Sequence, residues 1–306
     1  MLNTTEMLEP VIKWSGSKRV VAPQLASLFP KADRYFEPFV GGGAMLPFQP
    51  GSSAIAGDVI AELIELWMAI REKPDVVANE YEHRWQRLQR EGHAAYYDIR
   101  HSFNTTRNAY DLLFLTRTCV NGLIRFNSNR EFNNSLHHTR PGIAPSRLRS
   151  VIRQWSQYIQ CVDFVVADYH ETLARARSHD LVFLDPPYAG TKGRYMPEEF
   201  DVQEFCAELD RLNRVGVRWI LTFDGTAGKR AYAAIIPSDL YQVRLSIGTG
   251  NSPFTKLMRA GIDVVSESVY LNFEPPSKLL KAVSQHGQQR ERSLLDFNVQ
   301  QGRLFD

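Results

Sequence analysis

Short apolar stretches alternate with helical patterns along much of this sequence, and this alternation restricts the fold more than any other feature. Continuous apolar runs bounded by turn residues are typical of strands buried on both faces of a parallel sheet. Four such runs are Arg34–Phe39, Ala54–Asp58, Asp163–Ala167 and Leu181–Leu184, and Arg218–Phe223, Tyr241–Ile247 and Val264–Phe273 could complete the sheet. Helical patterns intervene at Ser17–Leu28, Ile60–Arg71, Glu171–Arg177 and Glu198–Arg214. We therefore expect an α/β protein with a doubly wound, Rossmann-like sheet.

The alternation is interrupted between Pro74 and Gln160. This part of the chain shows helical patterns around a polar loop at Val120–Pro141; the helices are expected at Val76–Arg90, Ala94–Phe103, Ala109–Cys119 and Pro145–Tyr158. We expect residues 1–73 and 161–274 to form one domain, residues 74–160 to form an inserted, mainly helical lobe, and residues 275–306 to form a weakly ordered tail.

Composition limits the class of protein. The 306 residues are 43% hydrophobic and 23% charged, as in an ordinary globular protein. No apolar run reaches membrane-spanning length and Met1–Pro10 lacks a signal-peptide pattern, so we expect a cytoplasmic protein without membrane partners. Cys119, Cys161 and Cys206 are far apart in sequence, which predicts neither a disulfide framework nor a metal site.

Positive charge is concentrated within the inserted segment. Between Arg107 and Arg153 there are eight arginines, no lysine and two acids, whereas the net charge of the whole chain is only +2. Arginine side chains suit phosphate groups and guanine edges, so this segment is a candidate for binding nucleic acid. A solvated basic face is the alternative. Among these arginines, Arg147, Arg149 and Arg153 stand near the start of a predicted helix and are candidates for phosphate contacts.

A glycine-rich loop follows the first predicted strand in Phe36-Glu37-Pro38-Phe39-Val40-Gly41-Gly42-Gly43. Glycines let the backbone approach a ligand closely, and ligands of open α/β sheets bind at the carboxyl ends of the strands. Leu46 stands where a dinucleotide fingerprint requires its third glycine. Asp58, at the end of the next strand, fits two roles, acceptor for ribose hydroxyls or N-cap of the following helix.

The stretch Val182-Phe183-Leu184-Asp185-Pro186-Pro187-Tyr188 ends a strand abruptly, because proline cannot continue a sheet ladder. A carboxylate and a proline carbonyl side by side offer two acceptors to a group with two N–H donors, and the tyrosine ring offers a stacking face. This combination suits a planar base with an exocyclic amine. Holding both hydrogens makes the nitrogen more nucleophilic toward a suitably placed methyl group, without a metal or a strong base.

The chain resembles the Dam-type (D12 class) DNA adenine-N6 methyltransferases in four places, which occur in the same order as in that family. These are Lys13-Trp14-Ser15-Gly16-Ser17-Lys18, the Glu37–Gly43 loop, the segment from Phe114-Leu115 through Asn121–Asn127 to Glu131-Phe132-Asn133, and Asp185–Tyr188. The resemblance implies a methyltransferase that uses S-adenosyl-L-methionine and acts on double-stranded DNA, with a DNA-recognition lobe inserted into the sheet domain. Base flipping is then required, because the amine is inaccessible within a stacked duplex.

The resemblance also implies roles for individual residues. Asp185, the carbonyl of Pro186, Pro187 and Tyr188 form the catalytic motif, with Tyr188 stacked on the flipped base. The residues expected to border the cofactor are Trp14, Lys18, Phe39, Gly41, Asp58, Asp168, Tyr169 and Asp185. Among these, Asp58 is expected at the ribose and Asp168 with Tyr169 at the adenosine base. The expected DNA contacts in the hairpin region are Lys13, Leu123, Arg125 and Asn127.

The sequence departs from the family at two positions of the hairpin. Val120 stands where Dam-type hairpins often have an aromatic wedge, and Ser135 stands where they often have a proline. The sequence of Ile124–Asn129 resembles that of restriction-linked members of the family, which read adenine-containing sites other than GATC. Two alternatives to a methyltransferase are an NAD-type oxidoreductase and a non-catalytic DNA-binding protein on the same scaffold. Neither explains the glycine loop and the Asp185–Tyr188 motif together.

The chain ends in Gln301-Gly302-Arg303-Leu304-Phe305-Asp306. The pattern Gln-x-x-Leu-Phe resembles the short peptides by which bacterial replication and repair proteins bind the sliding clamp, where two adjacent apolar side chains fill a pocket. The sequence therefore raises the hypothesis of a clamp contact through Gln301–Phe305. A tail that folds back on the body, or a chance match, is the alternative.

Overall fold

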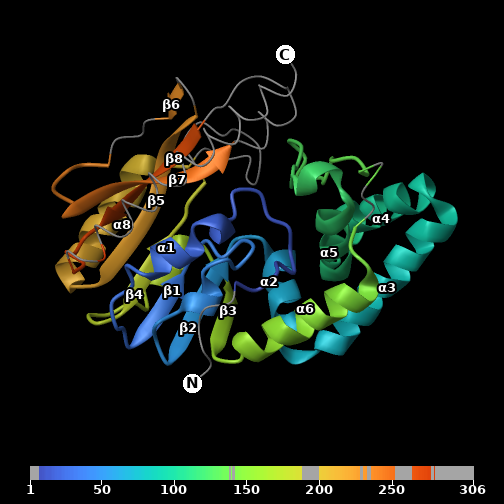
Figure 1. Ribbon diagram of the computed structural model, residues 1–306, viewed down its shortest axis with the longest axis horizontal. Coiled ribbons are helices and arrows are strands. Elements are labelled where there is room, and N and C mark those ends of the chain that lie inside the picture. The colour runs from blue at the N-terminus through green and yellow to red at the C-terminus, as the bar shows by residue number, and fades with distance from the viewer. Residues whose placement is uncertain are drawn as a thin grey trace, which may run out of the picture.

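The protein has a twisted sheet flanked by helices, with a group of further helices beside it (Figure 1). A computed structural model describes residues 7–137, 139, 142–187, 200–227, 230–232, 236–251, 264–276 and 279. Tyr188 and the segment Gln301–Asp306 lie outside these described residues. Among the helices that the structure describes, none is long and apolar enough to span a membrane.

The sheet has the order β3-β2-β1-β4-β5-β8-β7, and β6 pairs with β5 beside this path. The strands β1 to β5 pair in parallel, whereas β8 is antiparallel to both β5 and β7. Their bounds are β1 Arg34–Glu37, β2 Ser53–Asp58, β3 Val162–Val166, β4 Leu181–Leu184, β5 Arg218–Ala227, β6 Arg230–Tyr232, β7 Val243–Asn251 and β8 Val264–Leu271. The predicted α/β sheet is confirmed, and its antiparallel end is a feature that the strand predictions did not specify.

Two hydrophobic cores cover the two faces of the sheet, and alternate residues of each central strand contribute to them. Leu181 and Phe183 of β4 belong to one core, whereas Val182 and Leu184 belong to the other. This explains why β4 is apolar at every position: all four residues are buried. The first core includes residues of α1 and α2, and the second includes residues of α7 and α8. The strand β4 therefore ends in the middle of the molecule, where Asp185 follows it.

The helices follow the predicted pattern with some shifts at their ends. They are α1 Ala22–Ala26, α2 Ala61–Glu72, α3 Pro74–Glu91, α4 His93–Thr106, α5 Ala109–Thr118, α6 Pro145–Tyr158, α7 Tyr169–Leu173 and α8 Val202–Val215, with 3₁₀ turns η1 Lys18–Val20, η2 Leu46–Phe48 and η3 Val120–Gly122. The predicted helix Ser17–Leu28 is broken into η1 and α1, where Pro23 stands in the first turn of α1. The helix α7 begins at Tyr169, earlier than predicted, because the side chain of Asp168 caps it.

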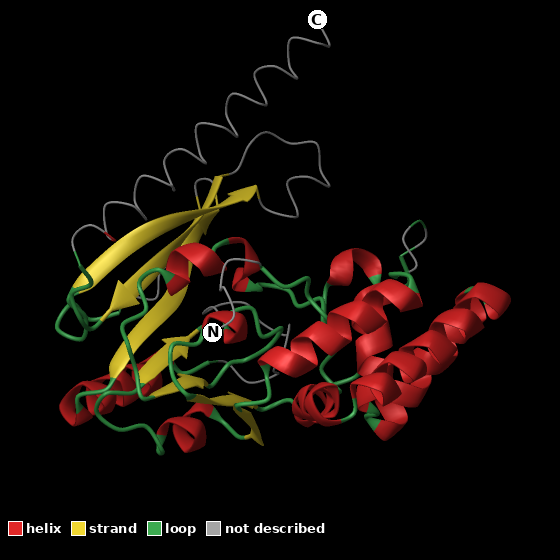
Figure 2. Ribbon diagram, turned by 60° about the horizontal axis from the view of Figure 1, so that its bottom comes forward, coloured by secondary structure: helices red, strands yellow, loops and turns green. Residues whose placement is uncertain are grey.

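The helices α3, α4, α5 and α6 lie together beside the sheet, as Figures 1 and 2 both show. The helix α3 packs against α4, α5 and α6, and α2 of the sheet domain packs against α5 and α6. Between α5 and α6, isolated bridges Cys119–Leu136 and Phe126–Phe132 form an irregular hairpin. We refer to residues 119–136 as the hairpin. The hydrophobic core of this helical part continues into the first core of the sheet.

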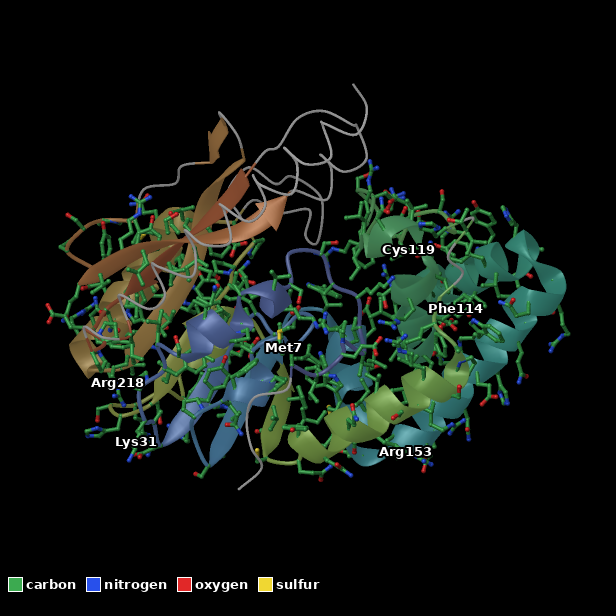
Figure 3. The ribbon with its side chains drawn as sticks, in the orientation of Figure 1. Met7, Lys31, Phe114, Cys119, Arg153 and Arg218 are labelled. Carbon is green, nitrogen blue, oxygen red and sulfur yellow. The ribbon has the colours of Figure 1, made fainter. Side chains whose placement is uncertain are left out.

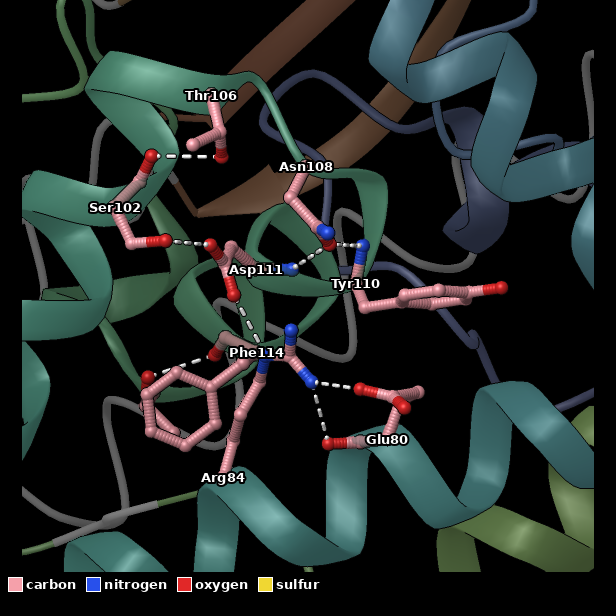
Figure 4. Close-up of polar contacts among 9 residues, drawn as sticks. Glu80, Arg84, Ser102, Thr106, Asn108, Tyr110, Asp111 and Phe114 are labelled. Atoms are coloured by element: carbon pink, nitrogen blue, oxygen red, sulfur yellow. Dashed lines mark hydrogen bonds and ion pairs between the residues drawn. The ribbon is translucent and has the colours of Figure 1, made fainter.

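A buried polar network joins three helices of this part (Figure 4). The carboxylate of Asp111 on α5 accepts hydrogen bonds from Arg84 Nε on α3, at 2.7 Å, and from Ser102 Oγ on α4, at 2.8 Å. The side chain of Asp111 is only 5% exposed and that of Arg84 is 16% exposed. The side-chain oxygen of Asn108 caps α5 by accepting from the backbone N–H groups of Tyr110 and Asp111. The network fixes the three helices relative to one another.

Replacement of Asp111 by alanine is expected to destabilise the helical part strongly, because it leaves the Arg84 guanidinium buried without its second counter-charge. The expected loss is about 3 kcal/mol in the free energy of unfolding, measured by urea denaturation. Asp98→Ala provides the control, since Asp98 on α4 is 63% exposed in its ion pair with Arg87 and its loss should cost under about 1 kcal/mol. Equal losses for the two variants would contradict the structural role of Asp111.

Candidate active site

A cavity of about 420 Å³ lies at the carboxyl ends of the parallel strands. Its wall is formed by the loops after β1, β2, β3 and β4 and by the segment that precedes η1. The cavity brings together predicted residues from five separate segments, namely Trp14, Lys18, Phe39, Gly41, Asp58, Asp168, Tyr169, Asp185, Pro186 and Pro187. The fold therefore places the predicted cofactor-binding residues and the described part of the predicted catalytic motif in one site.

The glycine loop after β1 is held close against two tryptophans. A Cβ atom at Gly41 would lie 2.7 Å from Trp14 Nε1, and Gly41 has a φ of +45°. A Cβ atom at Gly43 would lie 2.8 Å from Trp67 Cζ2. The indole N–H of Trp67 donates to the carbonyl of Gly41 at 3.0 Å. Glycine is needed here because both the backbone conformation and the space exclude a side chain. The loop is thus fixed with its backbone lining the cavity.

The carboxylate of Asp58 ties the end of β2 to this loop. Its two oxygens accept from the backbone N–H groups of Gly41, at 3.2 Å, and Ile60, at 3.1 Å. Ile60 is the N-cap residue of α2, and no side chain caps that helix. The N-cap alternative for Asp58 is therefore wrong in its strict form, although Asp58 does bond the backbone just before α2. Burial raises the pKa of Asp58 to about 6, against the lowering effect of these hydrogen bonds.

Aromatic rings form another part of the cavity wall. The rings of Phe39 and Tyr169 are stacked with centroids 5.6 Å apart, and Phe200 lies edge-on to Phe39 at 6.2 Å. Asp168, just before Tyr169, accepts from the backbone N–H of Glu171 at 2.9 Å and so caps α7. One side of the cavity is therefore apolar and flat, with a carboxylate at its edge, an arrangement that suits a planar base.

Charged side chains surround Asp185. Lys18 Nζ lies 2.8 Å from Asp185 Oδ1 and 3.3 Å from Glu267 Oε1, and it donates to the carbonyl of Gly16 at 3.2 Å. Thr222 Oγ1 also donates to Asp185 Oδ1, at 2.9 Å. The side chain of Lys18 is 4% exposed, whereas that of Asp185 is 21% exposed. Burial raises the pKa of Asp185, and the charge of Lys18 acts in the opposite direction.

Three polar residues close to Asp185 were missed by the sequence predictions. Thr222 on β5 and Glu267 on β8 surround Asp185 as described, and Glu37 on β1 is buried and accepts from the hydroxyl of Tyr35 at 3.1 Å. Burial raises the pKa of Glu37 well above its ordinary value. Thr222 had a weak signal, as the one polar residue within the apolar run Trp219–Phe223. Glu267 had none, because its position depends on the antiparallel pairing of β8 with β5.

The hairpin contacts the segment that leads into the cavity. A Cβ atom at Gly122 would lie 2.9 Å from Lys13 Cδ, and the backbone N–H of Ile124 donates to Ser15 Oγ at 3.3 Å. Asn134 donates to the carbonyls of Val120 and Leu123 at 3.0 and 2.7 Å. The structure thus brings Lys13 and the hairpin together at the edge of the site.

The predicted hairpin contacts differ in their surroundings. Arg125 is exposed, and its guanidinium has no partner among the described residues, whereas Leu123 is half-buried. Asn127 closes the hairpin turn: its side-chain oxygen accepts from the backbone N–H groups of Asn129 and Glu131. Its amide donates to the Glu131 carboxylate at 2.8 Å. Arg125 is therefore available for an external partner, whereas the polar groups of Asn127 are used within the turn.

The three arginines of α6 lie apart from the hairpin. Arg147 pairs with Glu9 at 3.0 Å, Arg149 with Glu82 at 2.9 Å and Arg153 with Asp75 at 2.8 Å. Figure 3 places Arg153 at the opposite end of the helical part from Cys119, where the hairpin begins. Much of the positive charge of the segment 107–153 is therefore balanced by acids from other segments. The structure does not bring these arginines together with Arg125.

Comparison with known proteins agrees with this geometry. The family model "D12 class N6 adenine-specific DNA methyltransferase" matches residues 14–226, which include every residue that lines the cavity. The chain belongs to this family. The D12 class was the family predicted from the four sequence motifs, and that prediction is confirmed, as is the α/β fold class. Family membership supports neither the oxidoreductase alternative nor the non-catalytic one.

Several characterised proteins resemble this D12-class chain. It is 29% identical over 199 residues to the retron Ec67 DNA adenine methylase of Escherichia coli, covering 63% of this chain and 68% of that protein. It is 29% identical over 194 residues to the type II methyltransferase M1.LlaDCHI of Lactococcus lactis subsp. cremoris, covering 59% and 66%. It is 30% identical over 186 residues to the DNA adenine methylase of Salmonella typhi, covering 58% and 64%. The matched region thus spans about two thirds of each relative.

Proposed function

We propose that this D12-class protein transfers a methyl group from S-adenosyl-L-methionine to the N6 amine of an adenine in a specific double-stranded DNA site. The observation that carries the proposal is the convergence of Asp185, Pro186 and the glycine loop on one cavity. A carboxylate and a main-chain carbonyl at the end of β4 supply two adjacent acceptors, which match the two N–H donors of an adenine amine.

The cavity has the features that this cofactor requires. The carboxylate of Asp58 at the end of β2 stands where ribose hydroxyls are bound in open α/β sheets. The ring of Phe39 and the carboxylate of Asp168 offer a flat apolar surface and a polar edge for the adenosine base. Gly41 leaves room for close approach to the backbone. When bound, the cofactor supplies an electrophilic methyl group on a positively charged sulfur.

The chain's own groups prepare the target amine. Asp185 and the carbonyl of Pro186 hold its two hydrogens, which draws the nitrogen lone pair out of conjugation with the ring and directs it at the methyl group. After methylation the nitrogen loses one proton, and the proton that leaves is one of the two that are hydrogen-bonded to these acceptors. We assign the stacking of the flipped base to Tyr188, which lies outside the described residues, and the rigid turn that orients the motif to Pro186 and Pro187.

The direct test is transfer of labelled methyl from S-adenosyl-L-methionine to plasmid DNA by the purified chain. We expect the label in N6-methyladenine at one recurring sequence, which sequencing of DNA from an expressing cell will identify. Label in cytosine, or none in DNA, would contradict the proposal. A site other than GATC would agree with Val120 and Ser135, the two departures of the hairpin.

Arg125→Ala is expected to relax site choice, because Arg125 is an exposed residue of the hairpin and a guanidinium forks onto a guanine edge. The expected loss of discrimination between the preferred site and sites changed at one base pair is about 1–3 kcal/mol, measured as a ratio of kcat/KM values. Arg214→Ala is the control: Arg214 is 71% exposed on α8, paired with Asp210. Unchanged selectivity in Arg125→Ala would exclude this role.

Cofactor affinity is expected to rise with pH through the pKa of Asp58, about 6, because the ionised carboxylate is the better acceptor for hydroxyl groups. Binding should be about tenfold weaker at pH 5 than at pH 7.5, measured by calorimetry with S-adenosyl-L-methionine. Folding stability depends on pH in the opposite direction. Because the pKa of Asp58 is raised in the folded state, the contribution of Asp58 to the free energy of unfolding falls as pH rises toward 6. Asp58→Asn should bind weakly without this pH dependence. A pH dependence retained in Asp58→Asn would assign it to another group.

Two finer proposals concern the setting of the enzyme. The type II methyltransferase among the relatives agrees with a role in restriction–modification. We place the enzyme in the cytoplasm, with DNA as its partner.

The proposed DNA contacts are Lys13, Leu123 and Arg125, whereas the placement of Asn127, Arg147, Arg149 and Arg153 gives no support to direct contacts. The clamp hypothesis for Gln301–Phe305 concerns residues outside the described part of the chain and stays a separate hypothesis.

A further inference from the structure

We propose that Thr222 directly, and Glu267 through Lys18, are positioning residues that fix Asp185 by its Oδ1 atom and so assign Oδ2 as the oxygen that accepts a hydrogen from the target amine. The inference rests on the proposed methyl transfer and adds to it two residues from the strands β5 and β8, together with a distinction between the two carboxylate oxygens.

The contacts of Asp185 are strongly asymmetric. Oδ1 accepts from Thr222 Oγ1 at 2.9 Å and lies 2.8 Å from Lys18 Nζ. Within the described part of the chain, Oδ2 has no hydrogen-bond partner, although the side chain is 21% exposed and lines the cavity. A carboxylate held at one oxygen by two donors from different elements has little freedom to rotate. The other oxygen then keeps a fixed direction before the substrate arrives.

Thr222 is itself held in place. It is fully buried on β5, next to β4 in the sheet, and its hydroxyl also lies 3.3 Å from the carbonyl of Leu184. The hydroxyl thus spans the two strands at the point where β4 ends and Asp185 begins. A valine of the same shape would keep the packing and lose the donor, which makes this position suitable for a test.

Glu267 acts on Asp185 through the shared lysine. Lys18 Nζ lies between Asp185 Oδ1 and Glu267 Oε1, at 2.8 and 3.3 Å, and donates to the carbonyl of Gly16. The ammonium group of Lys18 is therefore surrounded by acceptors from the segment before η1, from the end of β4 and from β8. A point charge on a flexible stem needs such surroundings to keep one position. Glu267 supplies the anchor farthest from Lys18 in the sequence.

The two residues have opposite effects on the charge of Asp185. The hydrogen bond from Thr222 lowers the pKa of Asp185, whereas the negative charge of Glu267 raises it. Among the described residues, Lys18 before α1 and Glu37 on β1 are the other charged groups that interact with Asp185, and both stay in place in the variants proposed below. Loss of the Thr222 hydroxyl and loss of the Glu267 charge should therefore move the acid limb of the pH–rate profile in opposite directions.

The test compares Thr222→Val, Thr222→Ser and Glu267→Gln with the wild type in methyl transfer to plasmid DNA. Thr222→Val should lower kcat about 10- to 100-fold, with KM for the cofactor and for DNA changed less than about twofold, and should move the acid limb to higher pH. Thr222→Ser should restore kcat. Glu267→Gln should lower kcat and move the acid limb to lower pH. Thr116→Val is the control, because Thr116 is an equally buried threonine on α5 whose hydroxyl bonds only a backbone carbonyl.

The outcomes separate this inference from the proposed function. An inactive wild-type protein would contradict the methyl-transfer proposal itself. An active wild type with unchanged kcat in Thr222→Val, or with acid limbs shifted in the same direction in Thr222→Val and Glu267→Gln, would overturn the positioning role alone. If Thr116→Val lowered kcat as much as Thr222→Val, the loss of kcat would reflect a disturbance of the fold and not a loss of positioning.

Discussion

Asp185→Ala is expected to lower the rate of methyl transfer to adenine about a thousandfold, the scale seen when one preorganised transition-state contact is removed. The physical reason is that Asp185 supplies one of the two acceptors that hold the amine. Among the described residues, no other carboxylate is adjacent to Pro186 in the sequence to take its place. The fold should persist, because Lys18 keeps Glu267 as a counter-charge at 3.3 Å. The measurement is single-turnover transfer of labelled methyl to plasmid DNA, alongside the thermal midpoint of unfolding.

The matched control for this change is Asp163→Ala. Asp163 lies on β3 and is 63% exposed, and among the described residues its ion-pair partner is Arg175, at 3.9 Å. This variant should keep the wild-type rate and thermal midpoint. Cofactor binding by Asp185→Ala, followed by calorimetry, separates loss of chemistry from loss of the cavity. Turnover of Asp185→Ala within about tenfold of the wild type would remove Asp185 from the mechanism.

Local sequence signals explain why the parallel part of the fold was predictable. The strand β4 is buried on both faces, so its four apolar residues stand out in the sequence, and Pro186 and Pro187 mark its end. The run of helices α3 to α6 could be predicted because helical patterns replace the alternation of strand and helix after Pro74. The order of the last strands was not predictable, because β8 lies between β5 and β7 through antiparallel pairing of residues distant in sequence.

The candidate site divides in the same way. Asp58 ends β2, Asp185 directly follows β4, and Gly41 lies in the loop after β1. The carboxyl ends of parallel strands meet at one edge, so the convergence of these residues could be predicted. Thr222 and Glu267 stand within strands, where their polar side chains gain meaning only from the neighbours that the sheet supplies. The charge of Arg147 also depends on a partner that the sequence does not show, because Glu9, with which it pairs, is remote in sequence. Charge counted along a segment does not show how much of it remains unbalanced on the surface.

Lys18→Met is expected to reduce both stability and activity, because it removes the ammonium group between Asp185 and Glu267. Both carboxylates then lose their common cation in a site where burial already raises the pKa of Asp185. The expected loss is about 3–5 kcal/mol in the free energy of unfolding near pH 8, with methyl transfer close to background. The loss should be smaller at pH 5. Carboxylates whose pKa is raised in the folded state bind more protons there than in the unfolded state, so stability falls as pH rises.

The double variant Lys18→Met/Glu267→Gln tests this explanation, because it removes one of the two facing carboxylates. It should recover part of the stability lost at pH 8 and show a weaker dependence of unfolding on pH than Lys18→Met. It should not recover methyl transfer, since Asp185 still lacks its cation. Lys31→Met is the control for loss of a lysine: Lys31 is exposed and lies at the edge of the sheet domain, away from the helical part (Figure 3). If Lys18→Met lost no more stability at pH 8 than at pH 5, repulsion between the two carboxylates would not be the reason that a cation is buried there.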